Sequence, residues 1–167
     1  MQVQYDHPFH CDAARYWSTF FSDEYNRALD EKLRMKRTVV ERSEDAAWIK
    51  RLIRFELQAR ELPALVKRIA GDRIGYEERT VYRRAQSVMD LMIVPSIPAL
   101  RGKFEMSGTF RVLPDRAGTV RREIRANVTV RVPLLGGQLE RLVAEELRKS
   151  YEAGAAFTRT WLAEHST

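Results

Sequence analysis

The residues of this 167-residue chain that best suit metal chemistry lie together in the segment HPFHCD, residues 7–12. His7, His10 and Cys11 are all residue types that bind transition metals. On a β-strand, however, residues three apart face opposite sides, so the two histidines diverge. A zinc site also needs a fourth ligand, and the sequence has no second cluster of Cys and His. We therefore expect neither a metal nor a cofactor.

Motifs for nucleophilic catalysis are also missing from the sequence. It has no Gly-rich phosphate loop and no G-x-S-x-G elbow, and the single cysteine has no base in a remote motif. Catalysis could come only from pocket groups such as Glu78, Tyr82 and Arg122, acting as acid–base partners. Because no motif selects these residues, the sequence favours a protein that is not an enzyme.

Three charged residues fall at or beside positions that should face the interior. In the alternation of their strands, Glu78 and Arg122 fall on the same side as the apolar residues that should be covered. Glu146 borders the apolar stripe of the last helix. Buried charges are unfavourable unless they are paired. These residues therefore either orient a polar ligand head or lie at strand ends in water, and the sequence leaves both interpretations open.

The composition is that of a globular domain, with 44% hydrophobic and 31% charged residues. We expect one domain over residues 1–167, with no signal peptide and no membrane span. The single Cys11 fits a reducing compartment, so we expect a cytoplasmic protein. The net charge of +6 indicates either ordinary surface charge or a polyanionic partner. We expect transient contact with anionic membranes and no nucleic acid partner; the sequence predicts no oligomeric state.

Hydrophobic periodicity predicts the elements that must position these residues. Alternation of apolar and polar side chains predicts antiparallel strands at residues 3–9, 34–42, 47–57, 73–83, 87–94, 103–112 and 120–132. Residues 87–94 are almost wholly apolar, which predicts a strand covered on both faces. Two short helices, Ala13–Phe21 and Glu24–Lys32, should follow the first strand.

Two further helices are expected. Residues 62–69 should form a short amphipathic helix with Pro63 at its first helical position. This helix could be a lid, a membrane-touching element or a crossover that packs on the sheet. The last helix should begin at Gln138, because an apolar stripe recurs at three- and four-residue steps from Leu139 to Trp161. Small residues at 153–156 would let a bulky group approach this helix closely.

Three segments carry a resemblance to a known superfamily: YDHPFHCDAARYWSTFFSDEY, LPALVKRIAGD and VPLLGGQLERLVAEELRKSYEAGAAFTRTWL. With the order of elements, they resemble the START-like, helix-grip (SRPBCC-type) superfamily of polyketide cyclases and lipid-transport domains. The amino-acid sequence of these segments is most similar to an uncharacterised bacterial branch of this superfamily, a domain-of-unknown-function family. The resemblance covers the whole chain and implies an α+β fold: a curved, antiparallel, seven-stranded sheet wrapped around a long C-terminal helix, with two short helices after the first strand.

In this superfamily an apolar cavity lies between the sheet and the long helix. We expect binding, sequestration or transfer of a hydrophobic small molecule that is lipid-, sterol- or polyketide-like; the alternative is a cyclase- or hydratase-type enzyme. The same side chains would also make a solid core with no cavity. The facing of each position predicts these pocket residues: Tyr76, Glu78, Tyr82, Phe104, Met106, Phe110, Arg122, Ile124, Val128, Val143, Leu147 and Tyr151.

Overall fold

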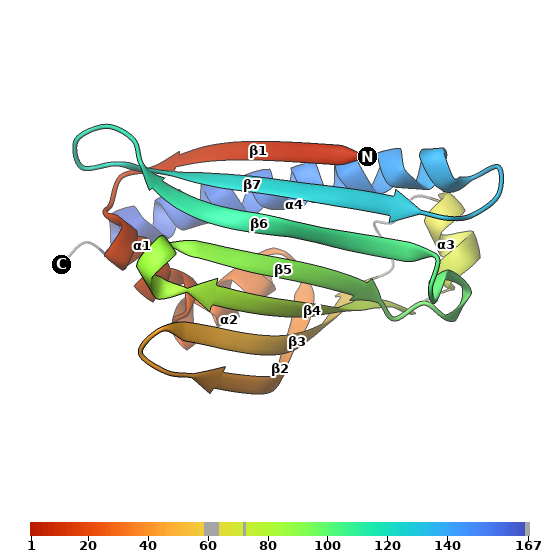
Figure 1. The fold of residues 1–167 in the computed structure, drawn as a ribbon, viewed down its shortest axis with the longest axis horizontal. Helices are drawn as coiled ribbons and strands as arrows, with labels where there is room; N and C mark the ends of the chain where they lie inside the picture. The colour runs from red at the N-terminus through yellow and green to blue at the C-terminus, as the bar shows by residue number, and fades with distance from the viewer. Residues whose placement is uncertain (59–63, 72, 166–167) are drawn as a thin grey trace.

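Alternating apolar and polar residues fold into a seven-stranded antiparallel sheet in the computed structural model, which describes residues 1–58, 64–71 and 73–165 (Figure 1). The strand order is β1-β7-β6-β5-β4-β3-β2, so the first strand pairs with the last. The seven antiparallel strands were predicted, whereas their order in the sheet was not. The strands are β1 Gln2–Phe9, β2 Met35–Glu44, β3 Trp48–Gln58, β4 Arg73–Arg83, β5 Val88–Pro95, β6 Phe104–Pro114 and β7 Val120–Val130.

Two short helices follow β1, as predicted, and each begins at a capping side chain. Asp12 accepts a hydrogen bond from the backbone N of Arg15 at the start of α1, Ala13–Phe20. Ser22 does the same for Tyr25 in α2, Asp23–Lys32. Both helices lie at one end of the sheet, and α3, Ala64–Ala70, lies at the other end (Figure 1).

The long helix α4, Gly136–Glu164, runs along the sheet and packs on β7 and β1 (Figure 1). Its expected start at Gln138 was wrong, because Gly136 and Gly137 already form the first turn. A Cβ atom on Gly136 would lie 2.3 Å from the backbone O of Val130, so only glycine fits where the helix touches β7. None of the described helices is long and apolar enough to cross a membrane.

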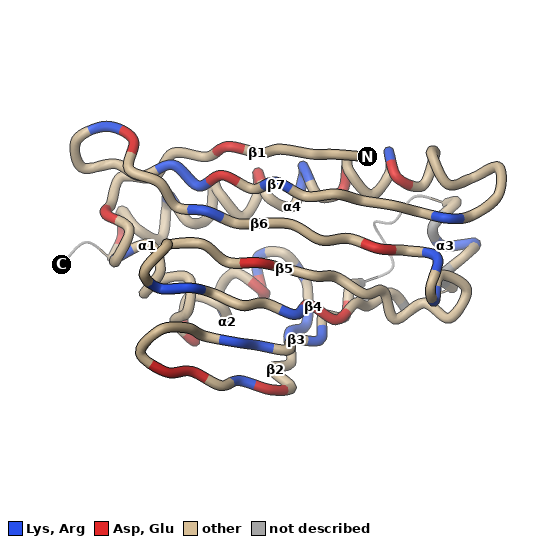
Figure 2. Tube along the Cα trace, in the orientation of Figure 1, with Lys and Arg blue, Asp and Glu red and all other residues tan. Residues whose placement is uncertain are grey.

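Among the described residues, no element covers the outer face of the sheet, because the helices lie on the inner side. The prediction that both faces of β5 are covered was therefore wrong. Met89, Leu91 and Ile93 point inward and are buried, whereas Met92 and Val94 are 48% and 46% exposed. Figure 2 shows acidic and basic residues interspersed along the strands rather than gathered in one block.

The described part of the expected helix at residues 62–69 packs inward. Leu65 and Ile69 of α3 lie against the main hydrophobic cluster, while Lys67 and Arg68 are exposed. This arrangement matches the interpretation of a crossover that packs on the fold. Leu62 and Pro63 lie outside the described residues.

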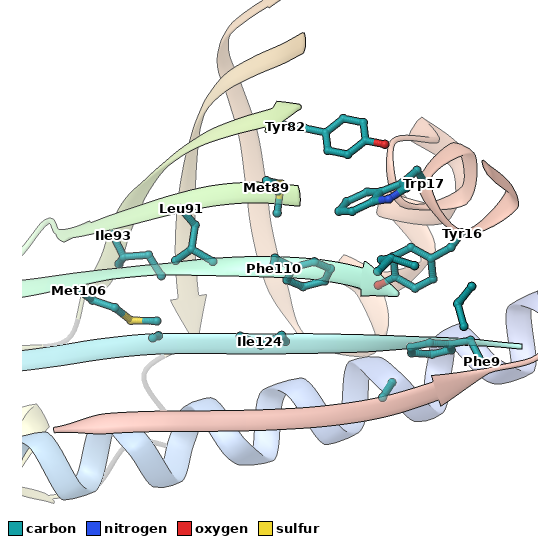
Figure 3. Close-up of a cluster of buried hydrophobic side chains, with 14 of the residues drawn as sticks. Phe9, Tyr16, Trp17, Tyr82, Met89, Leu91, Ile93, Met106, Phe110 and Ile124 are labelled. Carbon is teal, nitrogen blue, oxygen red and sulfur yellow. The ribbon is translucent and has the colours of Figure 1, made fainter. Parts of the chain in front are cut away.

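A cluster of aromatic side chains fills the end of the fold beneath α1 (Figure 3). The ring of Trp17 lies 4.2 Å from that of Tyr82, and its Nε1 donates a hydrogen bond to Ser87 Oγ at 2.7 Å. Phe9, Tyr16 and Phe110 complete this packing. The space between sheet and helices is therefore solid at this end.

A candidate ligand-binding cavity

A cavity of about 680 Å³ lies between the inner face of the sheet and α4. It exists because α4 packs on β7 and β1, and α2 on β2, leaving a space over the middle strands. Its size is within the range of small-molecule sites. The wall is largely apolar and includes Ile53, Phe55, Met89, Leu91, Ile93, Ile97, Leu100, Leu139 and Leu142.

The structure brings most of the sequence-predicted pocket residues to this cavity. Those in its wall are Tyr76, Glu78, Phe104, Met106, Phe110, Arg122, Val143, Leu147 and Tyr151. Tyr82, Ile124 and Val128 face inward but are not in the wall. Trp17 covers Tyr82, and α4 packs on the strand that carries the two aliphatic residues, which are 0% exposed. These three side chains belong to the solid core.

Arg122 is buried, so it does not lie at a strand end in water. Its side chain is 5% exposed and reaches the cavity wall from β7. Nη1 donates to the hydroxyl of Tyr16 at 3.3 Å, and Nη2 donates to Nδ1 of His7 and to the backbone O of Tyr151, both at 3.1 Å. Its Nε is buried without a hydrogen-bond partner among the residues that the structure describes.

A second buried arginine, Arg51 on β3, was not predicted from the sequence. Its Nε donates to Thr80 Oγ1 at 3.4 Å, and its guanidinium lies over the rings of Phe20 and Phe21. Burial lowers its pKa to about 10, so the group stays charged at neutral pH. The sequence did contain a signal for this residue. Arg51 lies two residues from both Ile49 and Ile53 and so faces the same inner side of the strand, although the neighbouring Leu52 obscured the alternation.

Glu78 faces the cavity from β4 as a half-buried carboxyl group. Within the described part of the chain it has no hydrogen bond and no ion pair within 4.0 Å. Burial raises its pKa, and the charges of Arg51 and Arg37 oppose this rise only partly. Glu78 is therefore a carboxyl group in the cavity wall that is more readily protonated than an exposed glutamate.

Two tyrosines near Glu78 also line the cavity. Burial, and the charge of Glu78, raise the pKa of both Tyr76 and Tyr151, so their hydroxyls stay protonated at neutral pH. Neither hydroxyl has a hydrogen-bond partner in residues 1–58, 64–71 or 73–165. Together with Glu78 they provide polar groups that a bound molecule could contact.

Two ion pairs lie elsewhere in the cavity wall. Arg37 forms an ion pair with Asp30 at 2.8 Å, and Lys149 forms one with Glu146 at 2.9 Å. For Glu146, the interpretation as a solvent-exposed side chain is the one that fits, since 41% of its side chain is exposed. The described residues contain no group of three His, Cys, Asp or Glu that could hold a metal, and His10 is exposed while His7 is buried.

The architecture matches solved structures of the START-like superfamily over nearly the whole chain. The TM-score is 0.68 with Zhui aromatase/cyclase from Streptomyces sp. R1128, at 12% identity, covering 99% of this chain and 96% of that chain. It is 0.60 with a START superfamily protein from Mycobacterium smegmatis, at 15% identity, covering 98% and 97%. It is 0.66 with norcoclaurine synthase from Thalictrum flavum, at 11% identity, covering 100% and 88%. The predicted helix-grip fold is confirmed.

Within this fold class the chain has a defined family. The family model described as "Protein of unknown function (DUF2505)" matches residues 4–162. The chain therefore belongs to the DUF2505 family. No curated protein sequence matches the chain significantly.

Proposed function

We propose that this protein binds a hydrophobic small molecule in the cavity between the sheet and α4, and thereby sequesters or transfers it. The observation that carries the proposal is the cavity itself, about 680 Å³ with a mainly aliphatic and aromatic wall. Burying apolar ligand surface there is favourable by about 25 cal/mol per Å². Met89 and Met106 let the wall adapt to an irregular molecule. The fold neighbours include a START superfamily protein, an aromatase/cyclase and norcoclaurine synthase, which supports this proposal.

Native mass spectrometry of freshly purified protein, followed by solvent extraction, tests the proposal. We expect a co-purifying hydrophobic molecule, or stoichiometric uptake of the neutral dye Nile red by the emptied protein. The variant Gly154→Leu should reduce dye uptake, because Gly154 lines the cavity and a Cβ there has no atom within 4 Å. Ala156→Leu, on the exposed side of the same helix, is the matched control. Protein that carries no molecule and takes up no dye would overturn the proposal.

A second candidate is a cyclase- or hydratase-type enzyme, favoured specifically by the unpaired Glu78. A carboxyl group with a raised pKa is a stronger base when ionised. Its carboxylate can take a proton from water as the water oxygen attacks the β-carbon of an enclosed unsaturated carbonyl compound, and the resulting carboxylic acid can return that proton to the α-carbon. Mass spectrometry of α,β-unsaturated and polyketone compounds incubated with the protein would detect gain or loss of water. Glu78→Gln should slow such turnover by about 10²-fold or more; unchanged turnover would exclude Glu78.

Transfer of a lipid would also require contact with a membrane, which we predict to be transient and electrostatic. The net charge of +6 favours anionic lipid. Co-sedimentation with phosphatidylglycerol vesicles at low salt, and its loss at high salt or with phosphatidylcholine vesicles, is the expected result. Equal binding to both vesicle types would contradict the electrostatic basis of the contact.

A further inference from the structure

The cavity contains more buried positive than negative charge. Arg51 and Arg122 are 7% and 5% exposed, and both line it. Glu78 is the acidic group that acts on Arg51, and it forms no ion pair within 4.0 Å with any described residue. Arg122 has no carboxylate partner in the described part of the chain; its partners are a hydroxyl, an imidazole and a backbone carbonyl. One buried guanidinium charge therefore lacks compensation even when Glu78 is ionised.

The two arginines lie at the same end of the cavity. The Cζ of Arg51 lies 5.3 Å from the ring centre of Phe20, and the Cζ of Arg122 lies 5.3 Å from that of Phe110. These two rings are themselves 5.4 Å apart. Each arginine thus contacts one ring of the same Phe20–Phe110 pair, and all four residues belong to the cavity wall.

Both guanidinium groups also have hydrogen-bonding capacity left over. Arginine has five N–H groups, and Arg122 donates to three acceptors. Its Nε is among the donors that have no partner in the described part of the chain. Arg51 donates to Thr80 and to the weak acceptor Met89 Sδ, and its Nη1 has no partner among the described residues. A buried charge with unused donors is strongly unfavourable unless another group compensates it.

We propose that Arg51 and Arg122 form a subsite for the acidic head group of the bound molecule, so that the ligand is a hydrophobic carboxylic acid bound as its carboxylate. This inference rests on the proposed function, since it specifies the chemical class of the ligand. A carboxylate supplies the single negative charge that the cavity lacks, and its two oxygens accept hydrogen bonds in the plane of a guanidinium group. The apolar remainder of the molecule would lie along the aliphatic wall toward Ile97 and Leu100.

Matched pairs of acid and alcohol test the subsite. Tetradecanoate and tetradecanol form an aliphatic pair, whose binding is measured by displacement of Nile red. Pyrenebutanoate and pyrenebutanol form an aromatic pair, whose binding is measured by pyrene emission. We expect each preferred acid to bind about tenfold or more tightly than its alcohol, because a charged hydrogen-bonded pair is lost in the alcohol. Whichever of the two acids binds more tightly shows whether the cavity prefers an aliphatic or an aromatic ligand. Measurements at 0.5 M NaCl suppress adsorption of the acids to the basic surface.

The variants Arg122→Gln and Arg51→Gln should each remove most of the preference for the acid while alcohol binding stays within about twofold. Arg122→Lys, which keeps the charge, should retain part of it. Arg121→Gln, on the exposed outer face beside Arg122, is the control and should behave like the wild type. If a glutamine variant does not fold, the comparison of acid with alcohol in the wild type remains decisive.

The failures of the two proposals are distinguishable. Equal affinity of the wild type for acid and alcohol would overturn the anion subsite and leave the hydrophobic cavity standing. A preference that survives in both glutamine variants would likewise overturn the assignment to these arginines. No binding of Nile red or of any probe would overturn the proposed function, and the subsite with it.

Discussion

Nη2 of Arg122 lies 3.1 Å from Nδ1 of His7, its registered partner on the neighbouring strand β1. Arginine can only donate, so Nδ1 must accept and the imidazole carries its hydrogen on Nε2. Protonation of His7 would remove this acceptor and place two cations side by side in a buried site. Burial first, and the charge of Arg122 second, lower the pKa of His7 to about 4.

His7 should therefore make folding stability depend on pH. The unfolded chain binds a proton at His7 below a pKa of about 6.5, whereas the folded protein binds it only below about 4. The stability associated with the neutral ring is fully present above pH 6.5 and is lost as the pH falls toward 4, by roughly 2–3 kcal/mol in total. His7→Gln should lose less stability than the wild type over this window in urea unfolding. The exposed His10→Gln is the control and should follow the wild type; an equal loss in His7→Gln would contradict the assignment.

Glu78 should have the opposite effect. Because burial raises its pKa, the folded state holds this proton more tightly than the unfolded state does. Its contribution to stability is greatest below pH 4.5 and falls as the pH rises and the buried group ionises. Glu78→Gln should therefore stabilise the protein at neutral pH by about 1 kcal/mol, with no gain near pH 4. Glu77→Gln removes only an exposed ion pair with Arg54 and should change little. Destabilisation by Glu78→Gln at pH 7 would show that Arg51 depends on this carboxylate.

The sequence predicted the fold well, because strand alternation and the helical stripe of α4 are local signals. The alternation along the last strand also predicted that Arg122 faces inward, and Arg122 is buried in the structure. The alternation of side chains along a strand does not show whether the second face of that strand is also covered. The apolar segment at β5 was therefore misjudged, since Met92 and Val94 face outward on a sheet with one layer of helices.

The boundary between cavity and core was less predictable, because it depends on where the helices lie over the sheet. Tyr82 and Phe110 both face inward, yet Trp17 covers the former and only the latter reaches the cavity wall. Arg51 shows the converse. Its inward parity was visible in the sequence, but its burial depends on the rings of Phe20 and Phe21, which belong to a distant segment of the chain.

Gly154 offers a direct test of empty space beside α4. It is buried and lines the cavity, and a Cβ built there meets no atom within 4 Å. Gly154→Ala should stabilise the protein by up to about 1 kcal/mol, because alanine has the higher helix propensity and no clash opposes it. Gly108→Ala is the contrasting case, since its Cβ would lie 2.4 Å from the backbone O of Arg125 and should destabilise strongly. Thermal unfolding measures both, and a destabilised Gly154→Ala would mean that the space is filled.

The buried contact between Tyr25 and Thr158 should account for much of the attachment of α2 to α4. Thr158 Oγ1 donates to the backbone O of Gly154 at 2.7 Å, so the hydroxyl of Tyr25, also at 2.7 Å, must be the donor to Thr158. Thr158→Val would leave this buried hydroxyl unsatisfied, and we expect a loss of about 1–3 kcal/mol in the free energy of unfolding. Tyr25→Phe alone should cost about 1 kcal/mol. Because the double variant leaves no polar group unpaired, its loss should be smaller than the sum of the two single losses. Additive losses in urea unfolding would show that the hydroxyl of Tyr25 finds another partner when Thr158 is absent.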